Sequence, residues 1–409
     1  MDSTLPIDGS KPYPVRRPSS VAEVGELVRA AVAAGEGVYP VGGRTALDVG
    51  LPPTKPGVAL DTTALDGVID YPARDMTITV QAGVTVGKLR AALAAEGQWL
   101  PVDIPRADAA TIGGAVALNL SGPHRLGYGT LRDYVIGVQF IADDGSVVNA
   151  GGRVVKNVAG YDLMKLQIGA LGTLGVVTQL TLKVRPKPEA AAAVRFGCEG
   201  HRLAVVLDAL HASKARPVVA HVSRAGTDIG RAPWWVTVVF EEKAATVPWQ
   251  VETLRAELAS APVIAVETLP DDPAPLVRDM TDAAAGWSPD GSAARFVWKA
   301  SVRPSRTAEF LTTATGLSAA LSLRAEALNG IVHGVVSAEI GEHAAADMLT
   351  KLTALAGDGS VVVRSCPPAW KGVLPVWGRP TGDTTLMRHV KRTLDPTDVF
   401  NPGRLFAPN

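Results

Sequence analysis

Four stretches rich in glycine and other small residues lie in the first half of the chain and constrain what it can fold into. They are Gly42–Thr45, Ala110–Gly122, a discontinuous third stretch made of Tyr128–Asp133, Gly152 and Lys156–Leu163, and Gly169–Thr178. A residue without a Cβ atom allows the backbone to come close to a ligand or to another segment. Each stretch alone is compatible with a tight turn. Four of them in order are far less expected by chance, and they predict a site in which backbone surrounds an extended ligand.

The first stretch, Gly42-Gly43-Arg44-Thr45, follows a predicted strand over Val38–Val41. Backbone N–H groups that point together form a nest for an anion, and here Thr45 adds a hydroxyl donor and Arg44 a charge. A diphosphate is the ligand expected for such a nest. The alternative interpretation is that the two glycines form a plain turn that binds no ligand. The stretch is not a P-loop, because no Gly-Lys-Ser/Thr follows it, and it is not a Rossmann fingerprint, because no helix is predicted to open there.

Length and composition limit the classes of protein to consider. The chain has 409 residues, of which 40 are basic, 40 are acidic and 47% are hydrophobic. A chain of this length is longer than a single hydrophobic core usually supports, so at least two domains are expected. Zero net charge and an aromatic content of 5% argue against a nucleic-acid partner, which needs basic patches or stacking platforms.

The two cysteines, Cys198 and Cys366, are too few for a disulfide framework, a four-cysteine iron–sulfur cluster or a zinc site. A reducing, cytoplasmic compartment is therefore expected. The polar, proline-containing N-terminus lacks the apolar run of a signal peptide. No apolar run reaches the roughly 20 residues that cross a bilayer, so membrane contact is expected only indirectly, through a partner.

Local patterns predict the elements of the first half. Ser20-Val21-Ala22-Glu23 is typical of a capping box at the start of a helix, and Thr85 is expected to begin a second helix that ends at Gly97. Strands are predicted over Val38–Val41, Val58–Leu60, Val68–Asp70, Thr77–Gln81, Val135–Ala142, Val147–Asn149 and Val176–Val184. Between Asp103 and Gly129 little regular structure is predicted.

Pro186 and Pro188 mark a domain boundary, after which strand-like runs alternate with amphipathic helices. The runs are 217–222, 234–240, 263–266, 295–302, 330–337 and 360–364, and the helices lie near 246–259, 273–285, 306–320 and 343–356. This pattern predicts an α+β layer of helices against a mostly antiparallel sheet. The predicted domains are residues 1–188, residues 189–375 and a C-terminal segment, 376–409, that returns to the first domain.

The four stretches together resemble the FAD-binding domain of the vanillyl-alcohol oxidase / p-cresol methylhydroxylase (PCMH-type) superfamily. The resemblance covers residues 15–190, and Phe400-Asn401-Pro402-Gly403-Arg404 is similar to the closing motif of that superfamily. Within it, Lys156–Leu163 and Leu120–Pro123 look most like the FAD-binding subunit of glycolate dehydrogenase (glycolate oxidase). The resemblance implies two α+β subdomains that clasp FAD, plus a cap domain over the flavin ring.

The resemblance also implies roles for individual residues. The pyrophosphate would be held by Gly42, Gly43, Arg44 and Thr45, and the flavin and ribityl side would be lined by Thr111, Gly113, Gly114, Asn119 and Ser121. The nucleotide end would be contacted by Gly129, Thr130 and Val176, while Asn401 and Arg404 would return from the tail towards the isoalloxazine.

Two departures from the superfamily affect the expected chemistry. Many members bond the flavin covalently through a histidine in the diphosphate loop, where this chain has Arg44, so the FAD is expected to be noncovalent. The 2-hydroxyacid dehydrogenases of the superfamily hold substrate with a histidine pair in the cap, often metal-bound. Here the seven histidines are scattered and show no metal-ligand spacing: His124, His201, His211, His221, His333, His343 and His389. No metal site and no catalytic residue can be assigned.

Two features of the cap region leave alternatives open. His333 is either a base that faces the flavin or a strand histidine with its own partner, and the second interpretation is favoured. Arg364 and Lys371, which flank Cys366-Pro367-Pro368, either bind a carboxylate or form surface salt bridges, and surface pairing is favoured.

Three functions follow from these observations. The first is the FAD-binding subunit of a multi-subunit 2-hydroxyacid dehydrogenase, most plausibly for glycolate to glyoxylate, which passes electrons to a second FAD-binding catalytic subunit and an iron–sulfur subunit. A partner is expected because this chain has no cluster ligands of its own. The alternative is a self-sufficient FAD-linked oxidase or dehydrogenase of another alcohol or sugar. The third is a scaffold that keeps the fold without flavin, an option raised by Arg44.

Overall fold

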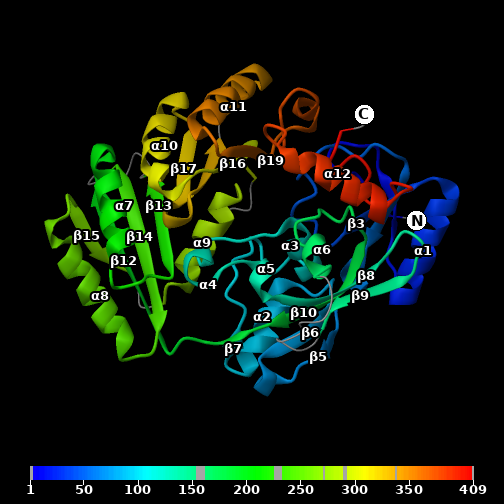
Figure 1. Cartoon of the computed structure of the whole chain (residues 1–409), viewed down its shortest axis with the longest axis horizontal. Coiled ribbons are helices and arrows are strands. Elements are labelled where there is room, and N and C mark those ends of the chain that lie inside the picture. The colour runs from blue at the N-terminus through cyan, green and yellow to red at the C-terminus, as the bar shows by residue number, and fades with distance from the viewer. Residues whose placement is uncertain are drawn as a thin grey trace. The chain divides into compact units, whose positions relative to one another are not determined.

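The computed structural model describes residues 3–152, 162–224, 233–269, 272–288, 293–336 and 339–407, which form two compact units (Figure 1). The first unit comprises Met1–Ser121, Thr130–Lys187 and Pro380–Asn409, and the second comprises Gly122–Gly129 and Pro188–Arg379. The short excursion Gly122–Gly129 into the second unit has no counterpart in the sequence patterns. None of the helices in the described part of the chain has the length and apolar composition needed to cross a membrane.

The first unit begins with a four-stranded sheet in the order β1-β2-β4-β3. Its strands are β1 (Thr4–Leu5), β2 (Tyr13–Arg16), β3 (Gly37–Val41) and β4 (Gly57–Asp61). β4 pairs in parallel with both β2 and β3. Helix α1 (Val21–Ala34) packs Val24 and Val28 against Val38 and Leu60 in a fully buried cluster.

The predicted capping box at the start of α1 is only half formed. The Ser20 side chain accepts a hydrogen bond from the Glu23 N–H at 3.2 Å, as expected. The Glu23 carboxylate, however, accepts from the N–H of Ser19 at 2.8 Å instead of from Ser20. Because Ser19 also has a hydroxyl group, the Glu23 carboxylate accepts a second hydrogen bond from that side chain. The two hydrogen bonds from Ser19 stabilise the charged carboxylate and lower the pKa of Glu23.

The second sheet of the first unit has five antiparallel strands in the order β5-β6-β10-β8-β9. They are β5 (Val68–Asp70), β6 (Thr77–Gln81), β8 (Val135–Ile141), β9 (Val147–Gly151) and β10 (Val176–Lys183). The other elements of the unit are helices α2 (Val86–Ala95), α3 (Ile112–Leu118), α5 (Leu131–Tyr134), α6 (Met164–Gln167) and α12 (Gly382–Leu394), and the short pair β7 (Gln98–Trp99) and β11 (Arg185–Pro186). Two α+β subdomains were predicted, and the two sheets with their helices confirm them.

The prediction of little regular structure between Asp103 and Gly129 was wrong, because α3 lies there. The Thr111 side chain caps this helix by accepting from the Gly114 N–H at 3.3 Å. Glycine inside a helix costs up to about 1 kcal/mol relative to alanine. Here close packing outweighs that cost, since a Cβ on Gly113 would lie 2.8 Å from the Ala82 carbonyl.

The C-terminal tail extends the four-stranded sheet at its β3 edge. The Val38 N–H donates to the Val399 carbonyl at 2.7 Å, and the Asn401 N–H donates to the Val38 carbonyl at 2.9 Å. Phe400 lies opposite Val38 in this parallel bridge and is completely buried. The four-stranded sheet from the N-terminal part of the chain and the C-terminal tail therefore form one continuous layer.

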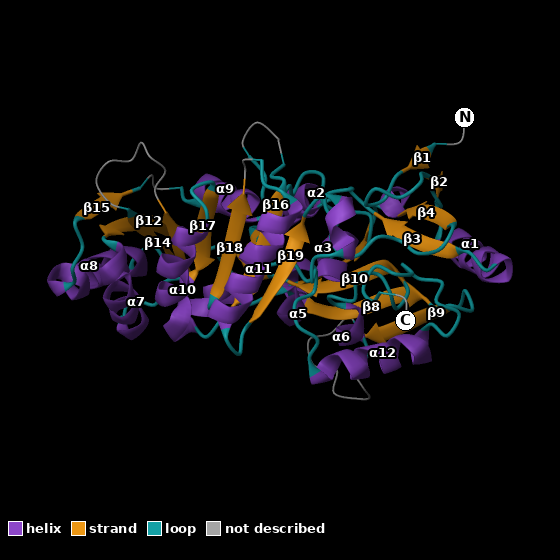
Figure 2. Cartoon of the chain, turned by 90° about the horizontal axis from the view of Figure 1, so that it is seen from above, coloured by secondary structure: helices purple, strands orange, loops and turns teal. Residues whose placement is uncertain are grey.

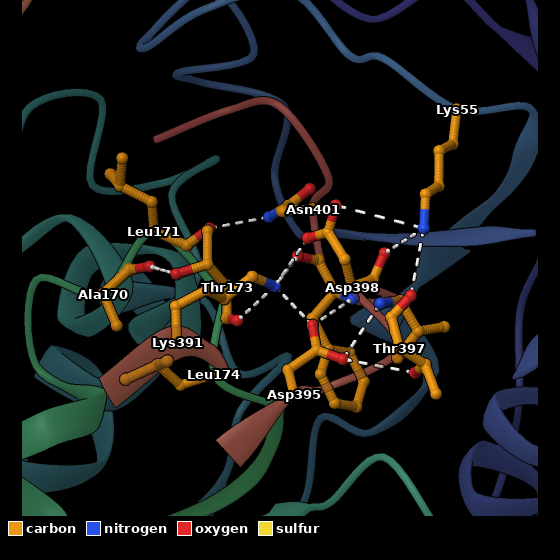
Figure 3. Close-up of polar contacts among 12 residues, drawn as sticks. Lys55, Ala170, Leu171, Thr173, Leu174, Lys391, Asp395, Thr397, Asp398 and Asn401 are labelled. Carbon is orange, nitrogen blue, oxygen red and sulfur yellow. Dashed lines mark hydrogen bonds and ion pairs between the residues drawn. The ribbon is translucent and has the colours of Figure 1, made fainter. Parts of the chain in front are cut away.

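A buried ion pair holds the tail in this place (Figure 3). The Asp395 carboxylate accepts from the N–H groups of Val399 and Phe400, each at 2.9 Å, and pairs with the Lys391 ammonium on α12. Lys391 also donates to the carbonyls of Thr173 and Phe400, each at 2.9 Å. The pair therefore ties α12, the tail and the glycine-containing turn at 169–175 together.

The second unit is built on an eight-stranded sheet in the order β15-β12-β14-β13-β17-β18-β16-β19, in which every pairing is antiparallel. The strands are β12 (Ala190–Cys198), β13 (Val219–Arg224), β14 (Trp234–Glu242), β15 (Ala265–Thr268), β16 (Phe296–Ser301), β17 (Leu321–Glu326), β18 (Ile331–Val336) and β19 (Ser360–Ser365). The helices are α4 (Arg125–Tyr128), α7 (Leu203–Ala212), α8 (Thr246–Glu257), α9 (Ala274–Ala284), α10 (Thr307–Ala314) and α11 (Glu342–Ala356). The predicted α+β layer with an antiparallel sheet is confirmed.

β12, β17 and α7 were not predicted. β12 begins with four alanines, and alanine is depleted in strands. It becomes a strand because its whole length pairs with β14 on one side and its C-terminal half pairs with β15 on the other. Long-range pairing of this kind cannot be read from a local pattern.

The excursion Gly122–Gly129 is anchored to the second unit by a buried polar cluster. Glu241 of β14 accepts from the Tyr128 hydroxyl at 3.0 Å and lies 3.0 Å from the His124 Nε2 atom. The Gly127 N–H donates to the Val218 carbonyl at 3.1 Å, and a Cβ on Gly127 would lie 2.7 Å from the Val218 side chain. This histidine thus has a structural partner.

Replacing Asp395 with alanine should strongly destabilise the first unit. The change leaves the largely buried Lys391 ammonium with only the more exposed Asp398 carboxylate, at 3.1 Å, as an ion-pair partner, and it frees two buried N–H groups. We expect the free energy of unfolding to fall by about 3–5 kcal/mol, the usual cost of removing one partner of a buried ion pair, as measured by chemical denaturation. The matched control is Asp66→Ala, because Asp66 forms an exposed pair with Lys88 and should cost at most about 1 kcal/mol. Equal losses for the two variants would contradict the structural role of Asp395.

Candidate functional site

One pocket in the first unit gathers residues from five separate parts of the sequence. It is bounded by Ile7, by the loop after β3, by α3 and the residues that follow it, by Leu171 and by the tail. Eight of the residues predicted for the cofactor site line it, namely Gly42, Gly43, Arg44, Thr45, Thr111, Gly114, Asn401 and Arg404. Their roles towards a ligand stay predictions, but the fold brings these residues to one place.

The two glycines of the first stretch are required by the close approach of a second loop. A Cβ on Gly42 would lie 2.1 Å from the Thr111 hydroxyl oxygen, and a Cβ on Gly43 would lie 1.7 Å from the Ala109 carbonyl oxygen. Real Cβ atoms do not come that close to other heavy atoms. The glycines therefore let the loop after β3 lie directly against the segment that opens α3.

This loop presents donors that the protein itself does not use. Within the described part of the chain, the N–H groups of Gly43, Arg44 and Thr45 have no hydrogen-bond acceptor. Arg44 adopts the left-handed conformation, with φ at 57°. Left-handed residues next to right-handed ones turn successive N–H groups towards one point, which is the geometry of an anion nest. The predicted diphosphate nest is consistent with this backbone.

The Arg44 side chain is oriented by a carboxylate. Its guanidinium lies 3.3 Å from Asp61 at the end of β4, while about half of the Arg44 side chain stays exposed. Asp61 is itself held by the N–H and hydroxyl of Thr63, at 2.9 and 2.6 Å. Arg44 therefore contributes a positive charge that is already partly paired.

The turn at 169–175 fixes the relation between α3 and the tail. The N–H groups of Gly169 and Leu171 donate to the carbonyls of Val116 and Ala117 on α3, at 3.0 and 2.8 Å. The Leu171 carbonyl accepts from the Asn401 side-chain amide at 2.6 Å (Figure 3). Asn401 is thus positioned from both its backbone and its side chain.

Arg404 has a different local role from Asn401. Its guanidinium is buried and donates to the Asp8 carboxylate at 2.8 Å. It also donates to the carbonyls of Leu47, Val49 and Leu51, at 2.6, 2.5 and 2.7 Å. Burial lowers the pKa of Arg404, although the Asp8 charge acts in the opposite direction. These bonds make Arg404 a positioning residue for the loop that forms one wall of the pocket.

Six predicted site residues do not line this pocket. Gly113 faces Ala82, Asn119 ends α3 in the left-handed conformation, and Ser121 is the last residue before the excursion. Val176 is fully buried in the core cluster with α1. The N–H and the hydroxyl of Thr130 both donate to the Asp133 carboxylate, and Gly129 belongs to the second unit. Most of Lys156–Leu163, up to Tyr161, lies outside the described residues.

Three residues important for the site were assigned no role by the sequence reasoning: Leu171, Lys391 and Asp395. The sequence Gly169–Gly175 was noted as a glycine-spaced stretch, which is a usable signal for Leu171. Lys391 and Asp395 are spaced i and i+4 on a predicted helix end, where such a pair is usually exposed. Only the tertiary structure shows that the Asp395 side chain is completely buried.

The candidates in the second unit are mostly engaged in structural contacts. His333 Nε2 lies 3.0 Å from the Glu326 carboxylate, in agreement with the interpretation of a strand histidine with its own partner. Arg364 and Lys371 both make interactions within the chain, and Lys371 is buried. Both cysteines are buried and outside disulfides, and burial raises the pKa of Cys198 to about 11. The described residues contain no group of three metal-ligating side chains.

Comparison with known proteins relates the first part of the chain to FAD-binding proteins. Residues 12–151 match the family model of an FAD binding domain. The chain is 41% identical over 140 residues to glycolate oxidase subunit GlcE of Escherichia coli (strain K12), an alignment that covers 34% of this chain and 40% of that protein. It is 34% identical over 180 residues to glycolate oxidase subunit GlcD of Bacillus subtilis (strain 168), covering 44% and 38% of the two chains.

Other relatives carry different substrate names. The chain is 35% identical over 175 residues to a D-lactate dehydrogenase of Archaeoglobus fulgidus, covering 43% of this chain and 39% of that protein. In each of these cases the chain spans about two fifths of the relative's length. Among solved structures, it resembles alkyldihydroxyacetonephosphate synthase with a TM-score of 0.72 and 18% identity, over 97% of this chain and 78% of the other. That likeness shows the fold.

The geometry of the pocket fits FAD. Unused N–H groups and the Thr45 hydroxyl suit a diphosphate, which is a strong hydrogen-bond acceptor. FAD is thus the cofactor, and the loop after β3 is the part of the chain best suited to its diphosphate.

A Gly43→Ala variant should lose FAD. The added methyl group must displace the Ala109 carbonyl, and overpacking of this kind costs about 1–3 kcal/mol. We expect FAD affinity to fall by about tenfold or more, measured as the flavin-to-protein absorbance ratio and by titration with added FAD. Gly382→Ala is the matched control, because a Cβ on Gly382 meets nothing within 4 Å. If the Gly43 variant bound FAD as tightly as the control, the close approach of the two loops would be irrelevant to cofactor binding.

Proposed function

Because this chain carries an FAD-binding domain of the PCMH type, we propose that it is an FAD-dependent oxidoreductase that acts in the oxidation of 2-hydroxyacids. The observation that carries the proposal is the pocket in which the glycine loop, α3 and the tail converge, because most of its lining residues belong to the segment 12–151 that matches the family model. The relatives named as glycolate oxidase subunits and as D-lactate dehydrogenases support the substrate class.

Within this class we propose glycolate as the substrate and glyoxylate as the product. The support is the identity of 41% with a protein named as a glycolate oxidase subunit, compared with 35% for the D-lactate dehydrogenase.

The FAD is proposed to be noncovalent. The loop that would hold the diphosphate has Arg44 where many members of the superfamily have a flavin-linking histidine. Bound FAD supplies two-electron redox chemistry at its isoalloxazine ring. The role of this chain is then to hold the cofactor: N–H groups of the loop bind the diphosphate, and the Asn401 side chain, fixed by Leu171, is held at the pocket wall.

The chain is further proposed to work as one subunit of a complex. The chain has only two cysteines, too few to ligate an iron–sulfur cluster, so electrons from the flavin must go to oxygen or to a partner. We propose a second FAD-binding catalytic subunit and an iron–sulfur subunit as the partners, with any membrane contact made through them. A cytoplasmic location is also proposed, since both cysteines are outside disulfides, as is usual in a reducing compartment.

Noncovalent binding can be tested by acid precipitation of the purified yellow protein. We expect all of the flavin to stay in the supernatant, because only hydrogen bonds and packing hold it. The Arg44→His variant is treated in the same way for comparison, because it places a histidine where many members of the superfamily have the flavin-linking histidine. Flavin that stays with the precipitated unmodified chain would show a covalent link and overturn this part of the proposal.

The subunit proposal is tested by anaerobic reduction. The chain purified in its native complex should show bleaching of the flavin band on addition of glycolate, whereas the isolated chain loaded with FAD should not. Co-purification should also yield a cysteine-rich iron–sulfur protein and a second flavoprotein. Bleaching of the isolated chain by glycolate would support a self-sufficient dehydrogenase instead.

A further inference from the structure

A second pocket of the first unit lies between α12 and the C-terminal tail, and we call it the tail pocket. The tail runs beside this helix in both views of the chain (Figure 1, Figure 2). The volume of the pocket is about 250 Å³, larger than the roughly 150 Å³ of an engineered apolar cavity that holds benzene. All of its lining residues belong to the first unit. The tail pocket therefore has room for a small organic molecule and is complete within one unit.

One cation of the tail pocket is fully engaged in holding the tail. The Lys391 ammonium pairs with the buried Asp395 carboxylate and lies 3.1 Å from Asp398 (Figure 3). It also donates to the carbonyls of Thr173 and Phe400, each at 2.9 Å. The charge of Lys391 is thus balanced by carboxylates of the same pocket, and a ligand must be recognised by other groups.

Two guanidinium groups, those of Arg388 and Arg392, also line the tail pocket. Residues four positions apart lie on the same face of a helix, with their Cβ atoms about 5–6 Å apart. Arg392 is exposed and, among the residues that the structure describes, forms no hydrogen bond and no ion pair. Because three cations and two carboxylates line the pocket, its lining has a net positive charge and favours an anionic ligand.

An aromatic ring of the tail holds Arg388 in place. The guanidinium carbon of Arg388 lies 4.7 Å from the centroid of the Phe406 ring, a distance at which a cation and a ring attract each other. A guanidinium stacks through its face and keeps its N–H donors in its own plane, so stacking leaves the edge of the group able to donate. Phe406, together with Leu405 and Pro396 in the same lining, gives the pocket an apolar part beside its cations.

One residue belongs to both the tail pocket and the candidate FAD pocket. Asn401 lines each of them, and its side-chain amide donates at 2.6 Å to the carbonyl of Leu171, which also lines the FAD pocket. A ligand shifts a protein towards the conformation that it binds better. A ligand that contacts both α12 and the tail therefore favours the position in which Asn401 reaches the FAD pocket.

We propose that the tail pocket is an effector site for a small phosphate monoester with an apolar or aromatic body, and that its occupation strengthens FAD binding. One guanidinium fork matches both oxygens of a carboxylate, whereas a phosphate group has three terminal oxygens and is shared by Arg388 and Arg392. The apolar body of the ester contacts Phe406 and Leu405. The site acts through the cofactor pocket and is independent of the substrate proposed above.

Binding is measured by calorimetric titration of the full chain with phenyl phosphate, in excess FAD so that the cofactor pocket stays occupied. Saturable binding is expected. Inorganic phosphate lacks the apolar body, and benzoate has the ring but only two oxygens. Each should bind about tenfold more weakly than phenyl phosphate, as for the loss of apolar contact or of a charged hydrogen bond.

Matched variants separate the site from a general effect of charge. Arg388→Met and Arg392→Met should each weaken phenyl phosphate binding by about tenfold or more, because each removes a charged hydrogen bond. Arg74→Met is the control, since Arg74 is an exposed arginine of the same unit that does not line the pocket. That variant should bind phenyl phosphate as the unmodified chain does. The melting temperature of each variant is recorded to show that it is folded.

Titrations of FAD with and without saturating phenyl phosphate test the link between the two pockets. The FAD dissociation constant of the unmodified chain should fall by about fivefold or more, as is typical of coupled sites. The Arg392→Met variant should lose this shift at the same concentration of phenyl phosphate. Competition for the diphosphate loop would instead raise the FAD dissociation constant.

The effector site would be overturned by the absence of saturable phenyl phosphate binding, by equal binding to the Arg392→Met variant, or by an FAD affinity that stays unchanged or falls. Equally tight binding of benzoate or inorganic phosphate would exclude the proposed ligand class. A chain that takes up FAD and gives any of these results refutes only the effector site. A chain that takes up no FAD contradicts the proposed function.

Discussion

The buried pair of Lys391 and Asp395 is the contact on which the candidate FAD pocket depends. The carboxylate organises the tail by accepting two backbone N–H groups, and the ammonium joins the tail to the turn at 169–175. Through these bonds Phe400 and Asn401 reach the edge of β3, next to the loop that carries Gly42 and Gly43. A site made from residues 42 and 401 needs such a link, because chain connectivity alone cannot bring them together.

Close backbone contact is the second constraint. Gly42 and Gly43 lie so near to Thr111 and Ala109 that a single methyl group would separate the loops. The same contact leaves N–H groups of the loop unused by the described part of the protein. The glycines thus allow the two loops to pack closely and leave backbone N–H groups available to a ligand. A sequence pattern that is weak in isolation therefore positions two loops of the fold.

The second unit uses its sheet differently. One face is apolar and packs under helices, which supplies the core. The other presents Lys299, His333 and Arg324 in one cross-strand row.

Local patterns in the sequence were sufficient for much of the fold, whereas other features were decided only by tertiary structure. The helix that begins after Ser20, the strand before Gly42 and the strands of the five-stranded sheet follow from capping residues and alternation, which act over a few residues. The glycine-rich stretches and the closing motif at Phe400–Arg404 were also sufficient to indicate an FAD-binding domain. By contrast, α3 forms despite two glycines because it packs on Ala82, and the alanine-rich β12 is a strand because β14 and β15 pair with it. Lys391 and Asp395 have the spacing of an ordinary surface pair, yet Asp395 is completely buried. The row of Lys299 and Arg324 exists only through strand register. Each of these depends on contacts between residues far apart in the chain, and the free energy of such contacts is set by packing and burial, which local sequence does not encode.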